Sequence, residues 1–345
     1  MEGEGGGEGK GGVRIDVGAG VEAARDHFVA VPRVHASTLT PLTFLRRFVA
    51  PSKPVILLGA AECWPALQRW QDPAYLLSAS GEAAVTLSRT PTGRADAVEG
   101  GSFFLPLNQT LPLRAALGAL LGGPGSGAAC GTPYLSAQDD CLRRELPVLA
   151  RDIGEVLVAE EALGHAEAKN VWIAPPTAGP RACASPPVSS THKDHYENLV
   201  TVVCGVKTFT LLPPTDAGFL ASRRFPVLRY AHADAACRGG GQACPGWSSA
   251  PVVGEAGGGG EPATVPWIAV NVDSPDAGEK YPLFRHATPL RVALEKGETL
   301  YLPALWYHQV GVGEGQEGLT VSVNSWFDME FGVPFVAQKL MGGVV

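Results

Sequence analysis

The chain has 345 residues, of which 45% are hydrophobic and 18% charged, and its formal net charge is −7 at pH 7. These values indicate a globular protein with a sizeable core, and the negative charge argues against general nucleic-acid binding, which needs a basic surface. We find no run of 18 apolar residues, so the sequence predicts no membrane-spanning segment.

The N-terminal region combines many glycines with charged residues and has no apolar core like that of a signal peptide. It predicts a disordered tail over residues 1–20. The seven cysteines form no CxxC pair, so we expect reduced thiols and a location in the cytosol or nucleus. His232, Cys237 and Cys244 lack a paired fourth ligand, so the sequence does not favour a zinc site there.

Apolar spacing and Pro/Gly punctuation predict helices early in the chain and strands later. Helices are predicted at 38–49, 64–70 and 111–123, with short strands at 55–58 and 83–88. Beyond Tyr134, strands are predicted at 170–174, 198–204, 207–214, 298–310 and 319–327. Short strands separated by turns favour an antiparallel barrel or sandwich. We therefore expect a helical and β region (21–130) packed on a barrel (131–345).

Two segments interrupt this pattern. Residues 175–188 and 231–263 are rich in Pro, Gly and Ala and lack alternating apolar positions. Such composition is typical of flexible surface insertions, which we predict for both segments. Because loop entropy grows slowly with length, the barrel should tolerate them.

The string HKDH contains His192 and Asp194, which point to the same side if this stretch is a strand. An imidazole and a carboxylate can occupy neighbouring metal positions, and His308 in LYLPALWYHQV is the best candidate for a third ligand. Two histidines and one carboxylate form the facial triad of non-haem Fe(II) oxygenases. The HxD pattern alone is short, and ordinary structural polar residues explain it equally well.

Lys207 is predicted on the same strand face as the apolar Phe209 and Leu211. A lysine there is costly unless it is paired. Its partner is either a protein carboxylate or a small dianion, such as a dicarboxylate with a 2-oxoacid end that would chelate the metal. The hydroxyls of Ser189 and Tyr134 could contribute hydrogen bonds to such a ligand.

The last predicted strand carries an unusual polar stripe. Thr320, Ser322, Asn324 and Trp326 share one face because side chains alternate along a strand. This stripe suits a ligand pocket better than a barrel core, and Asn198 can contribute to the same pocket.

Taken together, HKDHYEN, GVKTF, GETLYLPALWYHQV and VNSWFDMEFG resemble the JmjC-domain 2-oxoglutarate oxygenases, in particular their peptidyl-lysine (3S)-hydroxylase branch. The earlier strings KPVILLGAAECWPALQRW and GRADAVEGGSFFLPL are similar too, so the resemblance covers most of residues 35–335. It implies a mainly β fold with flanking helices, the double-stranded β-helix or cupin-like jelly roll. It further implies iron binding by His192, Asp194 and His308, and cosubstrate binding by Lys207, Ser189, Tyr134, Asn198, Asn324 and Trp326.

The resemblance also implies the cofactors and the reaction. Fe(II), 2-oxoglutarate and O₂ would support hydroxylation with release of succinate and CO₂. The implied substrate is a lysine, modified at C3, in a translation-associated GTPase of the developmentally regulated type. By charge alone, Asp328, Glu330 and Glu197 are candidates to receive its ammonium, although ordinary structural or solvated carboxylates are the simpler interpretation.

Two departures from the family pattern and several rival functions remain. Ser189 stands where the family usually has threonine, and the insertion at 175–188 directly precedes the metal strand.

A zinc hydrolase is disfavoured because Ser190 stands where its HxHxDH motif needs a histidine. Three other functions stay open. They are lysine demethylation, endopeptidase activity directed at methylated lysine or arginine, and a metal-free binding module. Relatives often dimerise through longer C-terminal helices, so a homodimer is also open.

Overall fold

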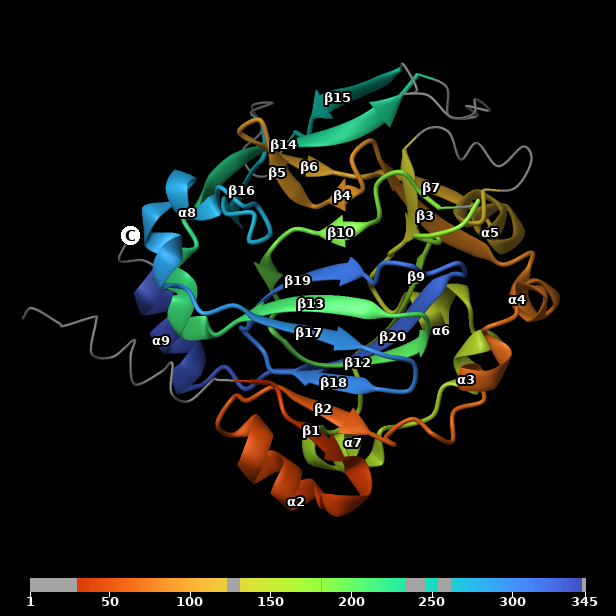
Figure 1. The fold of residues 1–345 in the computed structure, drawn as a ribbon, viewed down its shortest axis with the longest axis horizontal. Helices are drawn as coiled ribbons and strands as arrows, with labels where there is room; N and C mark the ends of the chain where they lie inside the picture. The colour runs from red at the N-terminus through yellow and green to blue at the C-terminus, as the bar shows by residue number, and fades with distance from the viewer. Residues whose placement is uncertain (1–29, 123–130, 181, 234–245, 254–261, 343–345) are drawn as a thin grey trace, which may run out of the picture.

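The computed structural model describes residues 30–122, 131–180, 182–233, 246–253 and 262–342. The predicted tail, Cys237 and Cys244 lie outside these residues. Two β-sheets face one another in the centre of the molecule, and helices flank them (Figure 1). Within the described ranges, no helix is long and apolar enough to cross a membrane. The predicted jelly roll with flanking helices is confirmed.

The larger sheet forms one wall of the jelly roll, and most of its neighbouring strands are antiparallel. In spatial order it contains β1 (Arg33–His35), β2 (Val55–Leu58), β18 (Thr299–Leu302), β12 (Tyr196–Cys204), β20 (Thr320–Asp328), β9 (Ala168–Ala174), β8 (Thr132–Leu135), β3 (Ala84–Thr90) and β7 (Leu107–Pro112). The opposite wall is a smaller sheet. Its order is β11 (His192–Lys193), β19 (Tyr307–Val312), β13 (Lys207–Leu212) and β17 (Leu290–Leu294).

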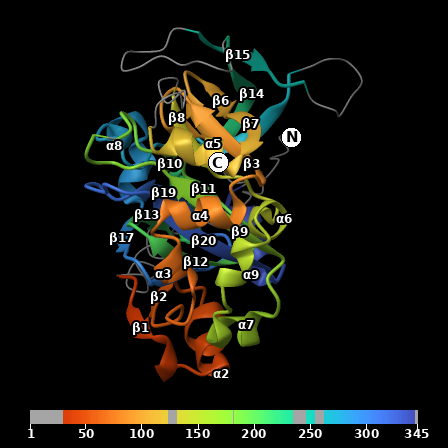
Figure 2. The same ribbon diagram turned by 90° about the vertical axis from the view of Figure 1, so that its right-hand side faces the viewer.

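A third sheet covers one end of the jelly roll, at the top of Figures 1 and 2. It contains β15 (Trp247–Pro251), β14 (Ser222–His232), β6 (Ser102–Leu105) and β5 (Ala97–Glu99), and β16 (Thr264–Ile268) also pairs with β14. A short parallel pair, β4 (Arg94–Ala95) and β10 (Val188–Ser189), lies between this sheet and β19 (Figure 1).

The helices are short and lie around the sheets. They are α2 (Pro41–Phe44), α3 (Ala66–Arg69), α4 (Pro73–Ser80), α5 (Leu113–Leu120), α6 (Cys141–Glu145), α7 (Leu157–Leu163), α8 (Ala277–Lys280) and α9 (Val333–Gly342). A π-helical turn, η2 (Leu45–Val49), extends α2, and 3₁₀ turns occur at η1 (Ala36–Thr38), η3 (Leu149–Asp152), η4 (Pro214–Phe219) and η5 (Pro282–His286). Thr40 caps α2 and Pro41 starts it, inside the helix predicted at 38–49.

Strand β12 shows why its sequence is an unbroken apolar run. Leu199 and Val203 pack against the helices outside the larger sheet, whereas Val200 and Val202 pack inside the jelly roll. Both faces of the strand are therefore buried. Because side chains alternate along a strand, successive residues enter two different hydrophobic cores instead of one core and the solvent. The residue that continues the inner row toward the open end is Asn198.

The predicted strand at 298–310 is wrong in one respect, because it is two strands, β18 and β19. Between them Leu305 adopts a left-handed backbone with φ of +69°. Its amide donates to the carbonyl of Asp194 at 2.9 Å. This turn allows one chain segment to contribute to both walls of the jelly roll and carries His308 to the smaller sheet.

Residues 175–188, predicted as a flexible surface insertion, form an irregular segment that hydrogen bonds attach to the rest of the protein at several points. The Thr177 hydroxyl donates to the Gly313 carbonyl at 2.8 Å, and the Thr132 hydroxyl donates to the Ser185 carbonyl at 2.7 Å. The amide of Val188 donates to the Gly93 carbonyl at 3.0 Å. Hydrogen bonds to backbone groups therefore anchor this segment, whose apolar residues lack an alternating pattern.

For residues 231–263 the prediction is wrong at the parts that the structure describes. The end of β14 and strand β15 pair in register, with His232 opposite Trp247 and Leu228 opposite Pro251. Trp247 also packs edge-on against Tyr230, with 5.8 Å between ring centroids. This aromatic contact therefore joins the two strands of the hairpin within the third sheet. Residues 234–245 and 254–261 lie outside the described residues.

We expect Gly93→Ala to destabilise the fold more than Gly101→Ala. Both glycines have positive φ, +77° and +87°, so alanine is strained at each. Only at Gly93 would the new Cβ meet backbone atoms, 2.6 Å from the Ser185 oxygen and 2.8 Å from the Pro186 oxygen. Overpacking of this kind costs about 1–3 kcal/mol. Thermal melting should show the difference, and equal melting temperatures would contradict the docking of residues 175–188.

Candidate active site

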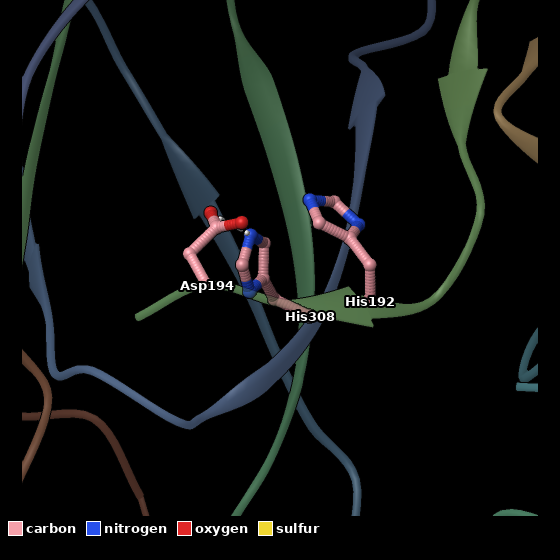
Figure 3. Close-up of side chains that lie close together, drawn as sticks. All are labelled: His192, Asp194 and His308. Atoms are coloured by element: carbon pink, nitrogen blue, oxygen red, sulfur yellow. Dashed lines mark ion pairs between the residues drawn. The ribbon is translucent and has the colours of Figure 1, made fainter. Parts of the chain in front are cut away.

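His192, Asp194 and His308 lie together at the end of the smaller sheet (Figure 3). His192 is directly opposite His308 in the antiparallel pairing of β11 with β19, and their ring centroids are 4.2 Å apart. Asp194 follows β11, and its carbonyl is fixed by the Leu305 amide. One ligand atom from each residue lies within 4.8 Å of the other two.

Hydrogen bonds orient both imidazoles for metal binding. The Nδ1–H of His192 donates to the Ser190 carbonyl at 2.8 Å, and that of His308 donates to the Trp306 carbonyl at 3.0 Å. In each ring this leaves the Nε2 lone pair free, which is the usual arrangement of a metal-binding histidine. Burial, together with the nearby His192, lowers the pKa of His308 to about 4, so it is neutral at pH 7.

The contact between His308 and Asp194 also points to a cation. Their Nε2 and Oδ2 atoms are 3.6 Å apart, and both atoms are acceptors when His308 is neutral. A buried imidazole nitrogen that faces a partly exposed carboxylate, with no proton between them, would be stabilised by a positive ion. Two imidazoles and one carboxylate, with other positions open, are the donor set of an Fe(II) facial triad. The three residues therefore fit the metal.

Lys207 lies at the first position of β13, 3% exposed, on the inner wall of the jelly roll. Its Nζ donates to the Tyr134 hydroxyl at 2.8 Å and lies 5.7 Å from the Trp172 ring centroid. Among the described residues no carboxylate pairs with it. Burial lowers the pKa of Lys207 to about 7. Of the two partners that the sequence allows, a protein carboxylate is thus excluded within the described ranges.

An inner cavity of about 70 Å³ joins Lys207 to the triad. Three of its lining side chains have a buried polar atom without a hydrogen-bond partner: Asn198 Oδ1, Ser322 Oγ and Trp326 Nε1. Each unsatisfied buried group costs about 1–3 kcal/mol. The cavity therefore offers an ammonium, a phenol and several unused polar groups to a polar guest. It suits a small dicarboxylate that reaches from the metal to Lys207.

The structure brings all the predicted cosubstrate residues to this cavity. Tyr134, Ser189, Asn198, Asn324 and Trp326 line it together with Lys207. The Ser189 hydroxyl oxygen accepts from the Val310 amide at 2.9 Å, which leaves its proton for a ligand. The Asn324 amide oxygen accepts from Trp172 Nε1 at 2.8 Å. The cosubstrate roles of these residues stay predictions.

Trp172 and Gln138 also line the cavity, and the sequence reasoning did not identify them. Alternation along the predicted strand at 170–174 puts Trp172 on one of two faces, but only the pairing of β9 with β20 shows that this face is the inner one. Ser322 lies opposite Trp172 in that pairing. Gln138 is in a loop, where no periodicity indicates its direction.

The three carboxylates proposed to receive a substrate ammonium lie elsewhere. Glu197 accepts hydrogen bonds from the Tyr301 hydroxyl at 2.6 Å and the Ala304 amide at 3.1 Å, so its role is structural. Asp328 and Glu330 are exposed, and neither lines the inner cavity or the larger one beside it. These positions agree with the simpler interpretation of the three residues as structural or solvated carboxylates.

That larger, outer cavity of about 410 Å³ opens beside the triad. Its walls come from the jelly roll and the third sheet, and they include Asp96, Phe103, Pro187 and Trp267. Pro187 belongs to the insertion at 175–188, so this segment forms part of the site. The outer cavity is large enough for a side chain to approach the metal while the inner cavity holds a cosubstrate.

We expect Lys207→Met to change how the stability of the metal-free, ligand-free protein depends on pH. The folded pKa of Lys207 is about 7 and its ordinary value is 10.5. Between these values the unfolded chain binds more protons, so the wild type gains stability relative to the variant as pH rises. The full penalty is present below pH 7 and amounts to roughly a few kcal/mol. Urea unfolding at pH 6 to 9 measures the difference, and a constant difference would show that the buried amine stays charged.

Comparisons with known proteins agree with this geometry. A family model described as a cupin-like domain matches residues 41–333. Lysine-specific demethylase JMJ32 of Arabidopsis thaliana is 37% identical over 305 residues, which cover 86% of this chain and 81% of the relative. The human bifunctional peptidase and (3S)-lysyl hydroxylase JMJD7 is 36% identical over 304 residues, or 88% and 85% of the two chains.

A third relative, JmjC domain-containing protein E of Dictyostelium discoideum, is 31% identical over 316 residues, which cover 86% of this chain and 84% of the relative. The matches extend through the jelly roll and the N-terminal region, so they are not confined to the metal motif. The chain therefore belongs to the cupin-like domain family and, within it, to the JmjC-domain oxygenases.

Proposed function

We propose that this JmjC-domain dioxygenase hydroxylates a lysine side chain at C3 in a protein substrate, with Fe(II), 2-oxoglutarate and O₂. The observation that carries the proposal is Lys207, a buried amine at the end of a cavity that opens on the triad, with no carboxylate partner in the described parts of the chain. The far carboxylate of 2-oxoglutarate would supply that partner. The name of the human relative supports lysine as the substrate.

Each residue of the triad has a defined task in this proposal. His192 and His308 would bind iron through Nε2 because backbone carbonyls hold their Nδ1–H groups. Asp194 would supply the anionic ligand from a backbone position that Leu305 fixes. A bound Fe(II) would supply the O₂-dependent redox chemistry, coupled to decarboxylation of 2-oxoglutarate to succinate and CO₂.

The inner cavity would orient the cosubstrate from its opposite end. Lys207 offers a cation and the Tyr134 hydroxyl a hydrogen-bond donor, since burial raises the pKa of Tyr134 well above its ordinary value and keeps the phenol protonated. Trp172 and Phe209 line the same space and exclude water around the charge pair. A charge-assisted hydrogen bond in this dry setting is stronger than one between neutral groups.

The protein substrate would approach through the outer cavity. A translation-associated GTPase of the developmentally regulated type remains the proposed target, and a cytosolic or nuclear location remains proposed with it. The Arabidopsis relative carries the name of a lysine-specific demethylase, and the human one is also named a peptidase. Demethylation and peptide cleavage therefore enter as alternative outcomes of the assay below.

We expect Lys207→Met to raise the 2-oxoglutarate concentration needed for turnover far more than Tyr134→Phe does. Loss of a desolvated charge partner costs about 3–5 kcal/mol, on the order of a hundredfold or more in affinity. The loss of one neutral hydrogen bond costs about 1 kcal/mol. Calorimetric titration of the Mn(II)-loaded proteins with 2-oxoglutarate measures both. Unchanged affinity in the Lys207 variant would remove the observation on which the function is based.

We expect the Fe(II)-loaded protein, given 2-oxoglutarate and air, to add 16 Da to lysine-containing peptides from candidate GTPases. His192→Ala should abolish the product and weaken Mn(II) binding, because two remaining ligands hold a metal poorly. His195→Ala is the matched control, since this nearby histidine packs against Phe331 and Phe335 instead. Loss of 14 Da from methylated peptides would indicate demethylation, and backbone cleavage would indicate a peptidase.

A further inference from the structure

The outer cavity contains a carboxylate that the metal site does not use. Asp96 lies between β4 and β5 with a left-handed backbone, φ +50°, and its half-buried side chain lines the cavity. Its backbone carbonyl accepts a hydrogen bond from the Ser190 hydroxyl. The other charged or titratable lining residues are Tyr134, His192, Lys193 and Asp194, of which His192 and Asp194 belong to the triad.

The Asp96 carboxylate has no partner among the described residues. His192 and Arg229 interact with it electrostatically, and neither forms a hydrogen bond or an ion pair with it. Lys193 does not approach it as a partner, because its Nζ lies 3.4 Å from His195 Nε2. Burial raises the pKa of Asp96, and interactions with His192 and Arg229 lower it only in part. A cation from outside would add a further favourable interaction.

An aromatic wall stands beside this carboxylate. The Trp267 indole is nearly parallel to the His192 ring, at 8°, with 6.3 Å between centroids. Its Nε1 donates to the Ser190 hydroxyl oxygen at 2.9 Å. Ser190 therefore holds both the indole and the Asp96 backbone, and its own carbonyl holds His192. An apolar face and an anion are thus fixed relative to the metal position.

This pairing matches the two parts of a lysine side chain. The methylene chain of lysine packs on apolar surface while its ammonium seeks an anion. Four bonds separate C3 from the ammonium nitrogen, so a lysine with C3 at the metal must place its charge farther along the same cavity. A cavity of about 410 Å³ has room for this. Glu197, Asp328 and Glu330 do not line it.

We propose that Asp96 is a cation-binding subsite that receives the ammonium of the substrate lysine, with Trp267 packing along its methylene chain. The identity of the substrate rests on the proposed function, whereas the preference for a cation rests on the cavity alone. In this arrangement Asp96 selects the residue to be modified, and the triad and Lys207 act on any residue so placed.

The conservative variant is Asp96→Asn. Asparagine tolerates a left-handed backbone as aspartate does, and the hydrogen bond from Ser190 goes to the backbone, so only the charge is lost. Asp96→Gly is the second variant, because glycine also accepts this backbone conformation. Asp328→Asn and Glu330→Gln are the controls for loss of an exposed carboxylate. Arg229→Gln tests the simpler explanation that Asp96 serves only to neutralise Arg229.

The probes are three peptide pools with randomised flanks and a fixed central residue, which is lysine, norleucine or glutamate. Binding to the protein loaded with Mn(II) and N-oxalylglycine is measured by equilibrium dialysis and mass spectrometry. We expect the wild type to bind the lysine pool about tenfold to a hundredfold more tightly than the norleucine pool. Both Asp96 variants should lose this preference and bind norleucine as the wild type does. The three controls should keep the preference.

Several outcomes would overturn the subsite. They are equal binding of lysine and norleucine by the wild type, equal weakening of both pools in the Asp96 variants, and loss of the preference in Arg229→Gln. A parallel assay with Fe(II), 2-oxoglutarate and air separates this result from the proposed function. An Asp96-dependent preference without lysine oxidation would refute the hydroxylase and keep the subsite. Lysine oxidation without that preference would support the hydroxylase and refute the subsite.

Discussion

A buried amine that pairs with no carboxylate of the described residues is the constraint around which this jelly roll is arranged. Lys207 could be accommodated as a neutral group against Tyr134, and its lowered pKa shows the cost of keeping it dry. The polar row of β20 and Asn198 of β12 complete a cavity that a hydrophobic core would otherwise fill. Such an interior is less stable than a packed one. In the proposed function, an anionic ligand between Lys207 and the metal would offset this cost.

Because side chains alternate along each strand, the polar cavity can lie beside two hydrophobic cores. Odd-numbered residues of β20 such as Val321 and Val323 pack under the helices, while even-numbered ones such as Ser322 and Asn324 face inward. The cost of the polar interior is therefore confined to one face of a few strands. Cross-strand pairing of His192 with His308 then fixes the metal position at the cavity mouth.

The sequence predicted the parts of the site that depend on alternation along one strand. Lys207 and the stripe of β20 were found this way, and the HKDH string together with the late histidine indicated the triad. The geometry of Asp96 and Trp267 could not be predicted, because it depends on hydrogen bonds through Ser190 between segments far apart in the chain. Composition did not indicate the order at 175–188 and 247–251, which backbone hydrogen bonds and one tryptophan provide in place of apolar patterning.

The division of the site between two sheets has a consequence for how such enzymes can diversify. The triad and Lys207 belong to the jelly roll, whereas Trp267 and Phe103 reach the outer cavity from β16 and β6 of the third sheet. Under the proposed function and subsite, the chemistry and the choice of target would depend on different segments of backbone. Replacing the third sheet while preserving Ser190 would then change the side chain that is oxidised and leave the oxidation itself unchanged, which makes this sheet a unit for recombination and for redesign.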